Sequence, residues 1–241
     1  MPATARPLED AVCAVIVAGG AGRRFGGDTP KQYRLLAGEP LILRTLRVFD
    51  ECPAIDRTVL VVPAGDIPRV AASILPGAGL IKPVHLAAGG QSRQESVCNG
   101  LQHIPEEVAF VAIHDAVRPL VSQACIAACI EGARLNGACI AALPAWDTLK
   151  QVEADGSIRG TLPRDRVWLA QTPQVFRVGL IRDAHAAALR SGWTGTDDAQ
   201  LVERIGARVH VTPGSRMNFK ITTSDDLHLA EMLLSSAPAP D

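Results

Sequence analysis

The chain has 241 residues, of which 47% are hydrophobic and 20% charged, a composition that excludes an intrinsically disordered protein. Its formal net charge of −1 argues against nucleic acid or an anionic membrane surface as a partner, so we expect neither. No apolar run approaches the ~20 residues of a membrane helix. Residues 1–10 lack the apolar core of a secretory signal. Both residues 1–10 and residues 235–241 are expected to be loose tails.

The first expected element is a buried strand over residues 12–18, in which every residue is apolar. Such a run is typical of a parallel sheet that is covered on both faces. It continues into Gly19-Gly20-Ala21-Gly22, followed by Arg23, Arg24 and then Lys31. Glycines at the end of a strand let backbone N–H groups approach a ligand, and cations placed after them suit a polyphosphate.

This stretch predicts a nucleoside triphosphate site, and the alternative is that its cations are solvated surface charges. Its G-G-x-G pattern differs from the G-x-G-x-x-G fingerprint of dinucleotide sites, and the G-x-x-x-x-G-K-[ST] pattern of P-loops is absent. A phosphate-bearing nucleophile is already anionic near neutral pH. A site with Arg24 and Lys31 but no evident base therefore fits phosphoryl or nucleotidyl transfer.

Strand and helix alternate between residues 40 and 143. Helices are expected over residues 40–51, 67–75, 92–104 and, after a cap by Ser122, up to residue 135; strands are expected over 57–62, 83–87, 108–113 and 138–143. Short loops between alternating elements predict a three-layer, Rossmann-like α/β fold with a mostly parallel sheet. Ligands of such sheets lie at the carboxyl ends of the strands.

Residues 144–173 break this rhythm. They contain Ala154-Asp155-Gly156-Ser157, a hairpin turn signal between two β-prone runs. Because an isolated hairpin is only marginally stable in water, we expect it to pack on the sheet or on another chain. Further along we expect helices over 178–190 and 197–205, a strand over 208–212, a β segment over 218–222, and a helix over 225–234 capped by Ser224. A single domain with a β-arm at about 145–170 follows.

Three further stretches could carry chemistry. Asp115 is the last residue of a buried strand, where a carboxylate is energetically costly unless it is paired or metal-bound. Arg118 could pair with Asp115 or hold a phosphate. His114 is expected to be a packed or hydrogen-bonded partner. The glycine-rich step over residues 89–96 could present helix N–H groups to an anion or a base edge, or be an ordinary turn. Lys220 is unremarkable by itself.

The six cysteines form no C-x-x-C pair. Cys125 and Cys129 would share one helix face, but without nearby histidines we favour buried core residues over a metal site. Reduced thiols and a cytoplasmic location are therefore expected.

Seven stretches occur in order from about Val12 to Leu233: AGGAGRRFGGDTPKQY, GGQSRQESV, HDAVRP, DTLK, TPQVF, TDDA and NFKIT. Together they resemble the 2-C-methyl-D-erythritol 4-phosphate cytidylyltransferases of the non-mevalonate isoprenoid pathway, which transfer CMP from CTP to methylerythritol phosphate, release pyrophosphate and require Mg²⁺. The resemblance implies a nucleotidyltransferase fold with a protruding β-hairpin arm, and these substrates and this metal. The alternatives are a cytidylyltransferase for another polyol phosphate, such as ribitol 5-phosphate, and a non-catalytic nucleotide sensor.

The resemblance also implies roles for individual residues. Arg24 and Lys31 would stabilise charge on the α-phosphate, and Asp115 and Arg118 would contact the acceptor near the triphosphate, with Asp115 as a metal ligand beside the triphosphate oxygens. The nucleotide would be bound by Ala18, Gly19, Gly20, Gly90, Gln91, Arg93 and Ser96. The acceptor would be held by Thr148, Arg164, Thr172, Thr196 and Lys220, of which Arg164 and Lys220 would grip its phosphate.

In the family the arm is exchanged across a homodimer, so that Thr148 and Arg164 would serve the neighbouring subunit's site. One departure from the family pattern is Val117, where alanine is usual; both are small and apolar, so we expect no consequence. Some relatives carry a fused cyclodiphosphate synthase domain. Because this chain stops after its last expected helix, a monofunctional enzyme is expected.

Overall fold

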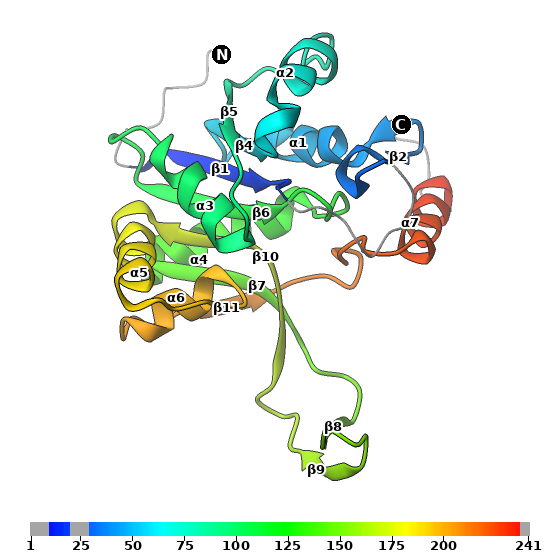
Figure 1. The fold of residues 1–241 in the computed structure, drawn as a ribbon, viewed down its shortest axis with the longest axis vertical. Coiled ribbons are helices and arrows are strands. Elements are labelled where there is room, and N and C mark those ends of the chain that lie inside the picture. Colours follow the sequence, from blue (N-terminus) through cyan, green and yellow to red (C-terminus); the bar gives the residue numbers. More distant parts are fainter. Residues whose placement is uncertain (1–9, 20–28, 237–241) are drawn as a thin grey trace.

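The computed structural model of the chain describes residues 10–19 and 29–236. A central sheet of seven strands is formed in this part of the chain, in the order β11-β7-β10-β6-β1-β4-β5 (Figure 1). Its strands are β1 Val12–Val17, β4 Arg57–Val62, β5 Val84–Ala88, β6 Phe110–Asp115, β7 Ala138–Pro144, β10 Trp168–Arg177 and β11 His210–Pro213. All neighbours are parallel except β10, which runs antiparallel to both β6 and β7, so the predicted mostly parallel α/β sheet is confirmed.

Helices cover both faces of this sheet. The longer ones are α1 Leu41–Glu51, α3 Arg93–Gln102, α4 Gln123–Asn136, α5 Val178–Ser191, α6 Asp198–Arg204 and α7 Ser224–Ser236. A short α2 Ile67–Arg69 continues into a π-helical turn, Val70–Ile74. Two small hairpins complete the elements, β2 Leu35–Leu36 with β3 Glu39–Pro40 and β8 Leu149–Val152 with β9 Ile158–Leu162.

Strand β1 shows why the fold has three layers. Alternate side chains of a strand point to opposite faces, and both faces of β1 are apolar. Residues 12, 14 and 16 pack with α1 and α4 on one side, whereas residues 13, 15 and 17 pack with α3, α5 and α6 on the other. Burial on both sides explains the continuous apolar run. The carboxyl end of β1 lies between those of β6 and β4, at the edge of the sheet where ligands bind in such folds.

Three expectations about local structure were wrong or incomplete. Residues 218–222 form no strand; they cross the sheet end as irregular chain, where Ile221 N donates to Val117 O at 2.9 Å. Thr223, not Ser224, caps α7, because its Oγ1 accepts from Asp226 N at 3.2 Å. Strand β10 was not foreseen, although the cap of α4 by Ser122 and the turn before β9 were predicted correctly.

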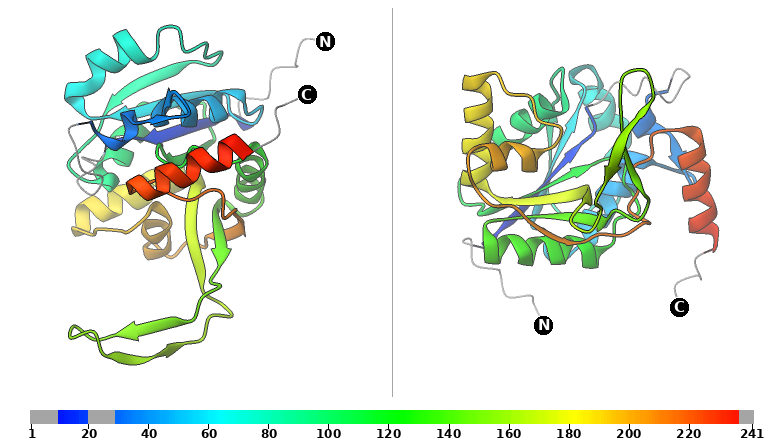
Figure 2. Two further views of the ribbon diagram at one scale, coloured as in Figure 1. Left: turned by 90° about the vertical axis from the view of Figure 1, so that its right-hand side faces the viewer. Right: turned by 90° about the horizontal axis from the view of Figure 1, so that it is seen from below.

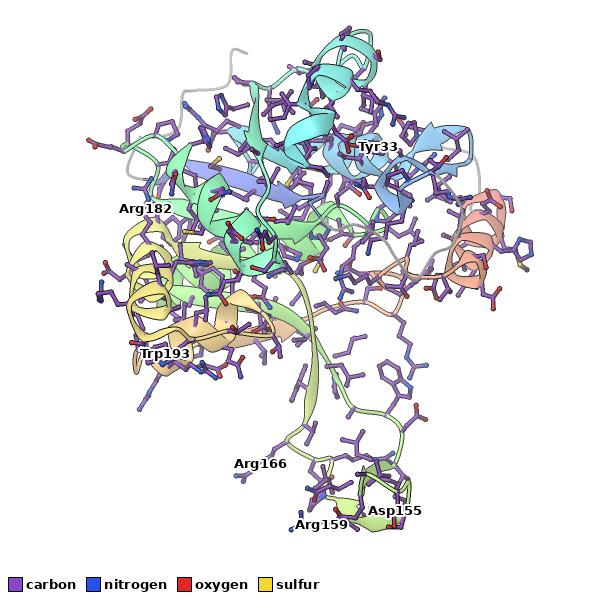
Figure 3. All side chains as sticks on the ribbon, in the orientation of Figure 1. Tyr33, Asp155, Arg159, Arg166, Arg182 and Trp193 are labelled. Carbon is purple, nitrogen blue, oxygen red and sulfur yellow. The ribbon has the colours of Figure 1, made fainter. Side chains whose placement is uncertain are left out.

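The β8–β9 hairpin projects from the body of the molecule (Figures 1 and 2). Its apolar side chains lie in solvent, with Val152 57%, Ile158 62% and Leu162 45% exposed. In Figure 3 the labelled hairpin residues Asp155 and Arg159 also point away from the body. Of the two expected packing partners, the chain's own sheet is therefore not the one used.

Five of the six cysteines are buried as expected, whereas Cys98 is half-buried. All six are free, and Cys125 and Cys129 are buried between α4 and the sheet. Among the described residues, no group of three or more His, Cys, Asp or Glu side chains is placed to hold a metal ion. Nor does any helix in the described part of the chain have both the length and the apolarity to cross a membrane.

Candidate functional site

Two glycine-bearing loops meet at the carboxyl ends of β1 and β5. A Cβ atom on Gly19 would lie 2.8 Å from Ser96 Oγ, and a Cβ on Gly89 would lie 3.4 Å from the Gly19 Cα. A Cβ on Gly89 would also lie 3.1 Å from Ser96 Oγ, so a side chain at either glycine would crowd that hydroxyl group. Ser96 Oγ joins the loops to α3, because it accepts from Gly90 N at 3.0 Å and donates to Ser92 O at 2.8 Å.

The first turn of α3 is held at the mouth of a cavity. Ser92 Oγ accepts from Glu95 N at 3.0 Å, and the Glu95 carboxylate accepts from Gln91 N at 2.8 Å, so the helix start is capped from both sides. The cavity has a volume of about 330 Å³. Seven residues predicted to bind nucleotide or its reacting phosphate line it: Ala18, Gly19, Lys31, Gly90, Gln91, Arg93 and Ser96.

A second cavity of about 230 Å³ adjoins the first. It is lined by three residues predicted to contact the acceptor, Arg118, Thr172 and Thr196. Both cavities share the side chains of Arg93, Asp115 and Lys220. Because these shared residues stand at the junction, two ligands bound in the two cavities would meet at this charged cluster.

Asp115 is the centre of the cluster. Its Oδ1 is 3.0 Å from Arg93 Nε, and its Oδ2 is 2.9 Å from Lys220 Nζ and 3.5 Å from Arg118 Nε. Burial acts to raise the pKa of the Asp115 carboxyl, but Arg93, Lys220 and Arg118 outweigh it and hold that pKa well below its usual range. Asp115 is therefore ionised at neutral pH and orders three cations around itself.

His114 supports Asp115 from behind without carrying charge. Burial lowers the pKa of His114 to about 4, so its imidazole is neutral at pH 7. Its Nε2 lies 3.1 Å from Arg118 O, a carbonyl that can only accept, so Nε2 carries the proton and Nδ1 accepts from Thr172 Oγ1 at 3.0 Å. Thr172 Oγ1 in turn accepts from Asp115 N at 3.2 Å. The prediction that His114 is a hydrogen-bonded partner is confirmed.

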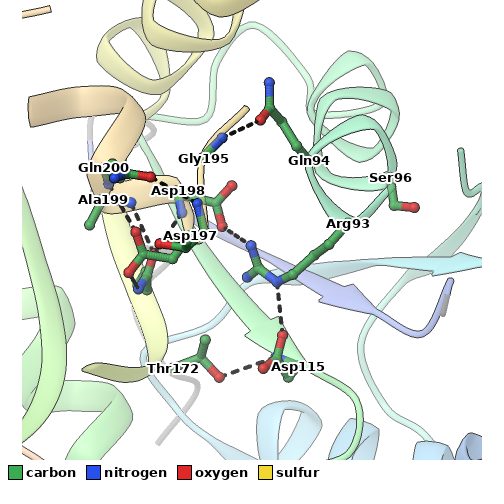
Figure 4. A network of polar contacts seen from close by, with 12 residues as sticks. Arg93, Gln94, Ser96, Asp115, Thr172, Gly195, Asp197, Asp198, Ala199 and Gln200 are labelled. Carbon is green, nitrogen blue, oxygen red and sulfur yellow. Dashed lines mark hydrogen bonds and ion pairs between the residues drawn. The ribbon is translucent and has the colours of Figure 1, made fainter. Parts of the chain in front are cut away.

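A second buried carboxylate, Asp198, was missed by the sequence interpretation. It is 1% exposed at the start of α6, and its Oδ2 lies 2.7 Å from Arg93 Nη1 (Figure 4). His185 Nε2 lies 3.3 Å from its Oδ1. Arg93 is thus clamped between carboxylates of β6 and α6, and its buried Nη2 has no hydrogen-bond partner in the described part of the chain.

One family model matches most of the chain. The model, described as 2-C-methyl-D-erythritol 4-phosphate cytidylyltransferase, covers residues 12–236. The chain belongs to this family. It is 47% identical over 227 residues to the 2-C-methyl-D-erythritol 4-phosphate cytidylyltransferase of Syntrophus aciditrophicus (strain SB), covering 94% of this chain and 97% of that protein. The enzyme of the same name from Geotalea uraniireducens (strain Rf4) is 45% identical over 93% of this chain and 97% of its own length.

Solved structures agree with the family assignment. The crystal structure of 4-diphosphocytidyl-2C-methyl-D-erythritol synthase from Anaerococcus prevotii DSM 20548 superposes with a TM-score of 0.82 at 30% identity, covering 94% of this chain and 99% of that one. The fold predicted for a cytidylyltransferase, including the hairpin arm, is therefore confirmed.

Not every residue predicted for a cytidylyltransferase site lies in the two cavities. Thr148 and Arg164 are exposed on the arm, and the Arg164 guanidinium donates to Trp146 O of the same arm. Gly20 and Arg24 lie outside the described residues. The arm pair is therefore separated from the Asp115 cluster within one chain, as expected if these two residues serve another subunit.

Proposed function

We propose that this chain transfers CMP from CTP to 2-C-methyl-D-erythritol 4-phosphate, giving 4-diphosphocytidyl-2-C-methyl-D-erythritol and pyrophosphate for isoprenoid precursor synthesis. One observation supports this most strongly: two adjoining cavities meet at a single cationic cluster, in a chain that matches enzymes named for this reaction along almost its full length. The names of those relatives do not favour ribitol 5-phosphate as the acceptor.

The first cavity suits the nucleotide. The glycines at positions 19 and 90 let the backbone approach the ligand closely, and the start of α3 adds its positive dipole end. Ser96 and Gln91 would hydrogen-bond the base and ribose. A site that hydrogen-bonds a base edge rejects bases that leave its polar groups unpaired.

The second cavity suits the phosphorylated acceptor. Arg118 and Lys220 place positive charge beside Thr172 and Thr196, which provide hydroxyl groups for the polyol. The acceptor phosphate is itself the nucleophile, and it attacks the α-phosphorus in line while pyrophosphate leaves. Because this nucleophile is anionic near pH 7, the reaction needs charge stabilisation by Lys31 and Arg24 rather than a general base.

The donor set fits Mg²⁺ bound largely through the substrate. Among the described residues lining the first cavity, Asp115 is the only carboxylate. Magnesium prefers one or two carboxylates together with phosphate oxygens, so Asp115 would hold it beside the triphosphate. When bound, it supplies charge neutralisation on the triphosphate.

The exposed arm supports a homodimer in which each arm completes the site of the partner subunit. Burial of the apolar hairpin side chains, for example Ile158 at 62% exposure, would give the hairpin the partner that its stability requires. The free thiols of all six cysteines support a cytoplasmic location.

A substrate panel tests the reaction. With CTP and Mg²⁺, the chain is expected to release pyrophosphate faster with methylerythritol phosphate than with ribitol 5-phosphate or erythritol 4-phosphate, because the second cavity is shaped for one polyol. Product formation is followed by ³¹P NMR. Faster turnover of ribitol 5-phosphate would contradict the proposed acceptor, and CTP binding without pyrophosphate release would indicate a nucleotide sensor instead.

Mixed dimers test the exchanged arm. Arg164→Ala is expected to raise KM for the acceptor, and Lys31→Ala to lower kcat. Refolding the two variants together at equal amounts should restore about a quarter of the wild-type activity at low acceptor concentration, because each mixed dimer then has one site with intact Lys31 and an intact arm. Mixing Lys31→Ala with Lys31→Met, which damage the same part of the site, is the control and should restore nothing. Lack of recovery in the first mixture would count against the exchange.

A further inference from the structure

Gln94, the second residue of α3, makes a contact outside both cavities. Its carboxamide Nε2 donates to Trp193 O at 3.1 Å. Its Oε1 accepts from Gly195 N at 2.9 Å, the bond drawn in Figure 4. One half-buried side chain thus uses both its donor and its acceptor on the short segment that joins α5 to α6. We refer to residues 193–197 as the acceptor segment, because it carries Thr196.

The acceptor segment is also held from its other end. Thr196 N donates to Gln200 Oε1 at 2.9 Å, and the Gln174 carboxamide donates to Asp197 Oδ2 at 2.8 Å. Packing leaves little freedom at Gly195, where a Cβ atom would lie 2.9 Å from both Asp197 O and the Leu201 side chain. Two side chains of α3 therefore hold this region: Gln94 bonds residues 193 and 195 of the segment, and Arg93 pairs with Asp198 directly after it.

The same turn of α3 contributes to the nucleotide cavity. Arg93, the neighbour of Gln94, is ion-paired with Asp115 and with Asp198, and Ser96 lies two residues beyond Gln94. Thr196 lines the second cavity, while Gln94 is not among the described residues that line either one. One helical turn therefore joins the wall of the nucleotide cavity to the wall of the acceptor cavity.

We propose that Gln94 is a positioning residue for the acceptor: it fixes the acceptor segment against α3 and so places Thr196 in the second cavity. The inference rests on the proposed function, since it takes methylerythritol phosphate as the ligand of that cavity. It assigns Gln94 no contact with either substrate. Loss of its two hydrogen bonds should weaken acceptor binding and leave nucleotide binding intact.

The variant Gln94→Met has nearly the same shape and loses both bonds. We expect it to raise KM for methylerythritol phosphate about tenfold, which corresponds to about 1.4 kcal/mol, with KM for CTP and kcat changed less than about twofold. Gln94→Glu keeps an oxygen that accepts from Gly195 N but loses the donor to Trp193 O, so its KM should lie between those of the wild type and Gln94→Met. Gln102→Met, at the exposed far end of the same helix, is the matched control and should change neither KM.

Hydrogen exchange of the Gly195 amide, measured by NMR, gives a readout that does not depend on activity. Exchange should be faster in Gln94→Met and remain slow in Gln94→Glu and Gln102→Met, because only the first variant removes the acceptor oxygen. An unchanged acceptor KM or unchanged Gly195 exchange in Gln94→Met, beside an active wild type, would overturn the role of Gln94. A wild-type protein that forms no product would instead overturn the proposed function itself.

Discussion

Replacement of Lys31 by methionine is expected to lower kcat at least about a hundredfold, with a much smaller change in KM for CTP. Lys31 lines the first cavity together with Asp115 and Lys220. In the proposed reaction, charge develops there on the α-phosphate during transfer. An ammonium group aimed at developing charge stabilises the transition state more than the ground state, so its loss reduces kcat rather than binding. Pyrophosphate release at saturating CTP and acceptor measures this effect.

Two further variants separate the charge of Lys31 from its structural role. Lys31→Arg keeps the charge and should retain more activity than Lys31→Met, whereas Arg190→Ala removes an exposed cation from α5 and should have no effect. The turn that carries Lys31 is anchored elsewhere, because Tyr33 Oη donates to Asp66 Oδ2 at 2.8 Å and Arg69 stacks 4.5 Å from the Tyr33 ring centroid. Unfolding of Lys31→Met is therefore not expected, and an unchanged kcat would refute the assigned role.

Much of the fold could be predicted from local pattern. Strands β4 and β6 lie inside the sheet and are covered on both faces, so they appear as uninterrupted apolar runs. Strand β10 is different: its first residues, such as Trp168, are exposed in the arm, and its last ones, such as Phe176, are buried in the sheet. Pairing with β7 shifts between Ala170 and Gln174, so no single alternation runs through the strand.

The incorrect prediction of a β segment over residues 218–222 is explained by contacts with distant parts of the chain. Residues 218–222 have a β-like composition, but Asn218 O accepts from Arg118 Nη1 at 2.7 Å and Asn218 Nδ2 donates to Thr172 O at 2.7 Å. These contacts hold the segment across the end of the sheet and bring Lys220 to Asp115. Long-range side-chain bonds of this kind override β propensity, and sequence alone does not show them.

Site residues could be predicted where they belong to short motifs, but not where their role depends on a partner far away in the sequence. Gly19 and Gly90 follow the ends of β1 and β5, and Asp115 is the last residue of β6; such positions mark ligand sites in parallel sheets. Asp198 was named only as part of a motif, because its partner Arg93 lies 105 residues away. The available clue was its position directly after Asp197, whose side chain caps α6 and leaves the next carboxylate to point inward.

Removal of divalent cations is expected to abolish product formation. The first cavity is lined by Lys31, Arg93 and Lys220, but Arg93 and Lys220 are already paired with Asp115. In the proposed reaction these side chains would leave much of the triphosphate charge uncompensated, so we expect a divalent cation to supply the rest. Product formation is measured in excess chelator and again after Mg²⁺ is added back.

The chelator experiment also tests the assignment of Asp115. Full recovery on adding Mg²⁺, together with no inhibition by chelator already saturated with Mg²⁺, would show that the effect comes from the metal. If Asp115 contacts the metal as well as holding the three basic side chains around it, Asp115→Asn should raise the Mg²⁺ concentration needed for half-maximal activity. Undiminished turnover in excess chelator would contradict a metal requirement. If Asp115→Asn instead lowers kcat without changing the Mg²⁺ requirement, the role of Asp115 is only to hold Arg93, Arg118 and Lys220 in place.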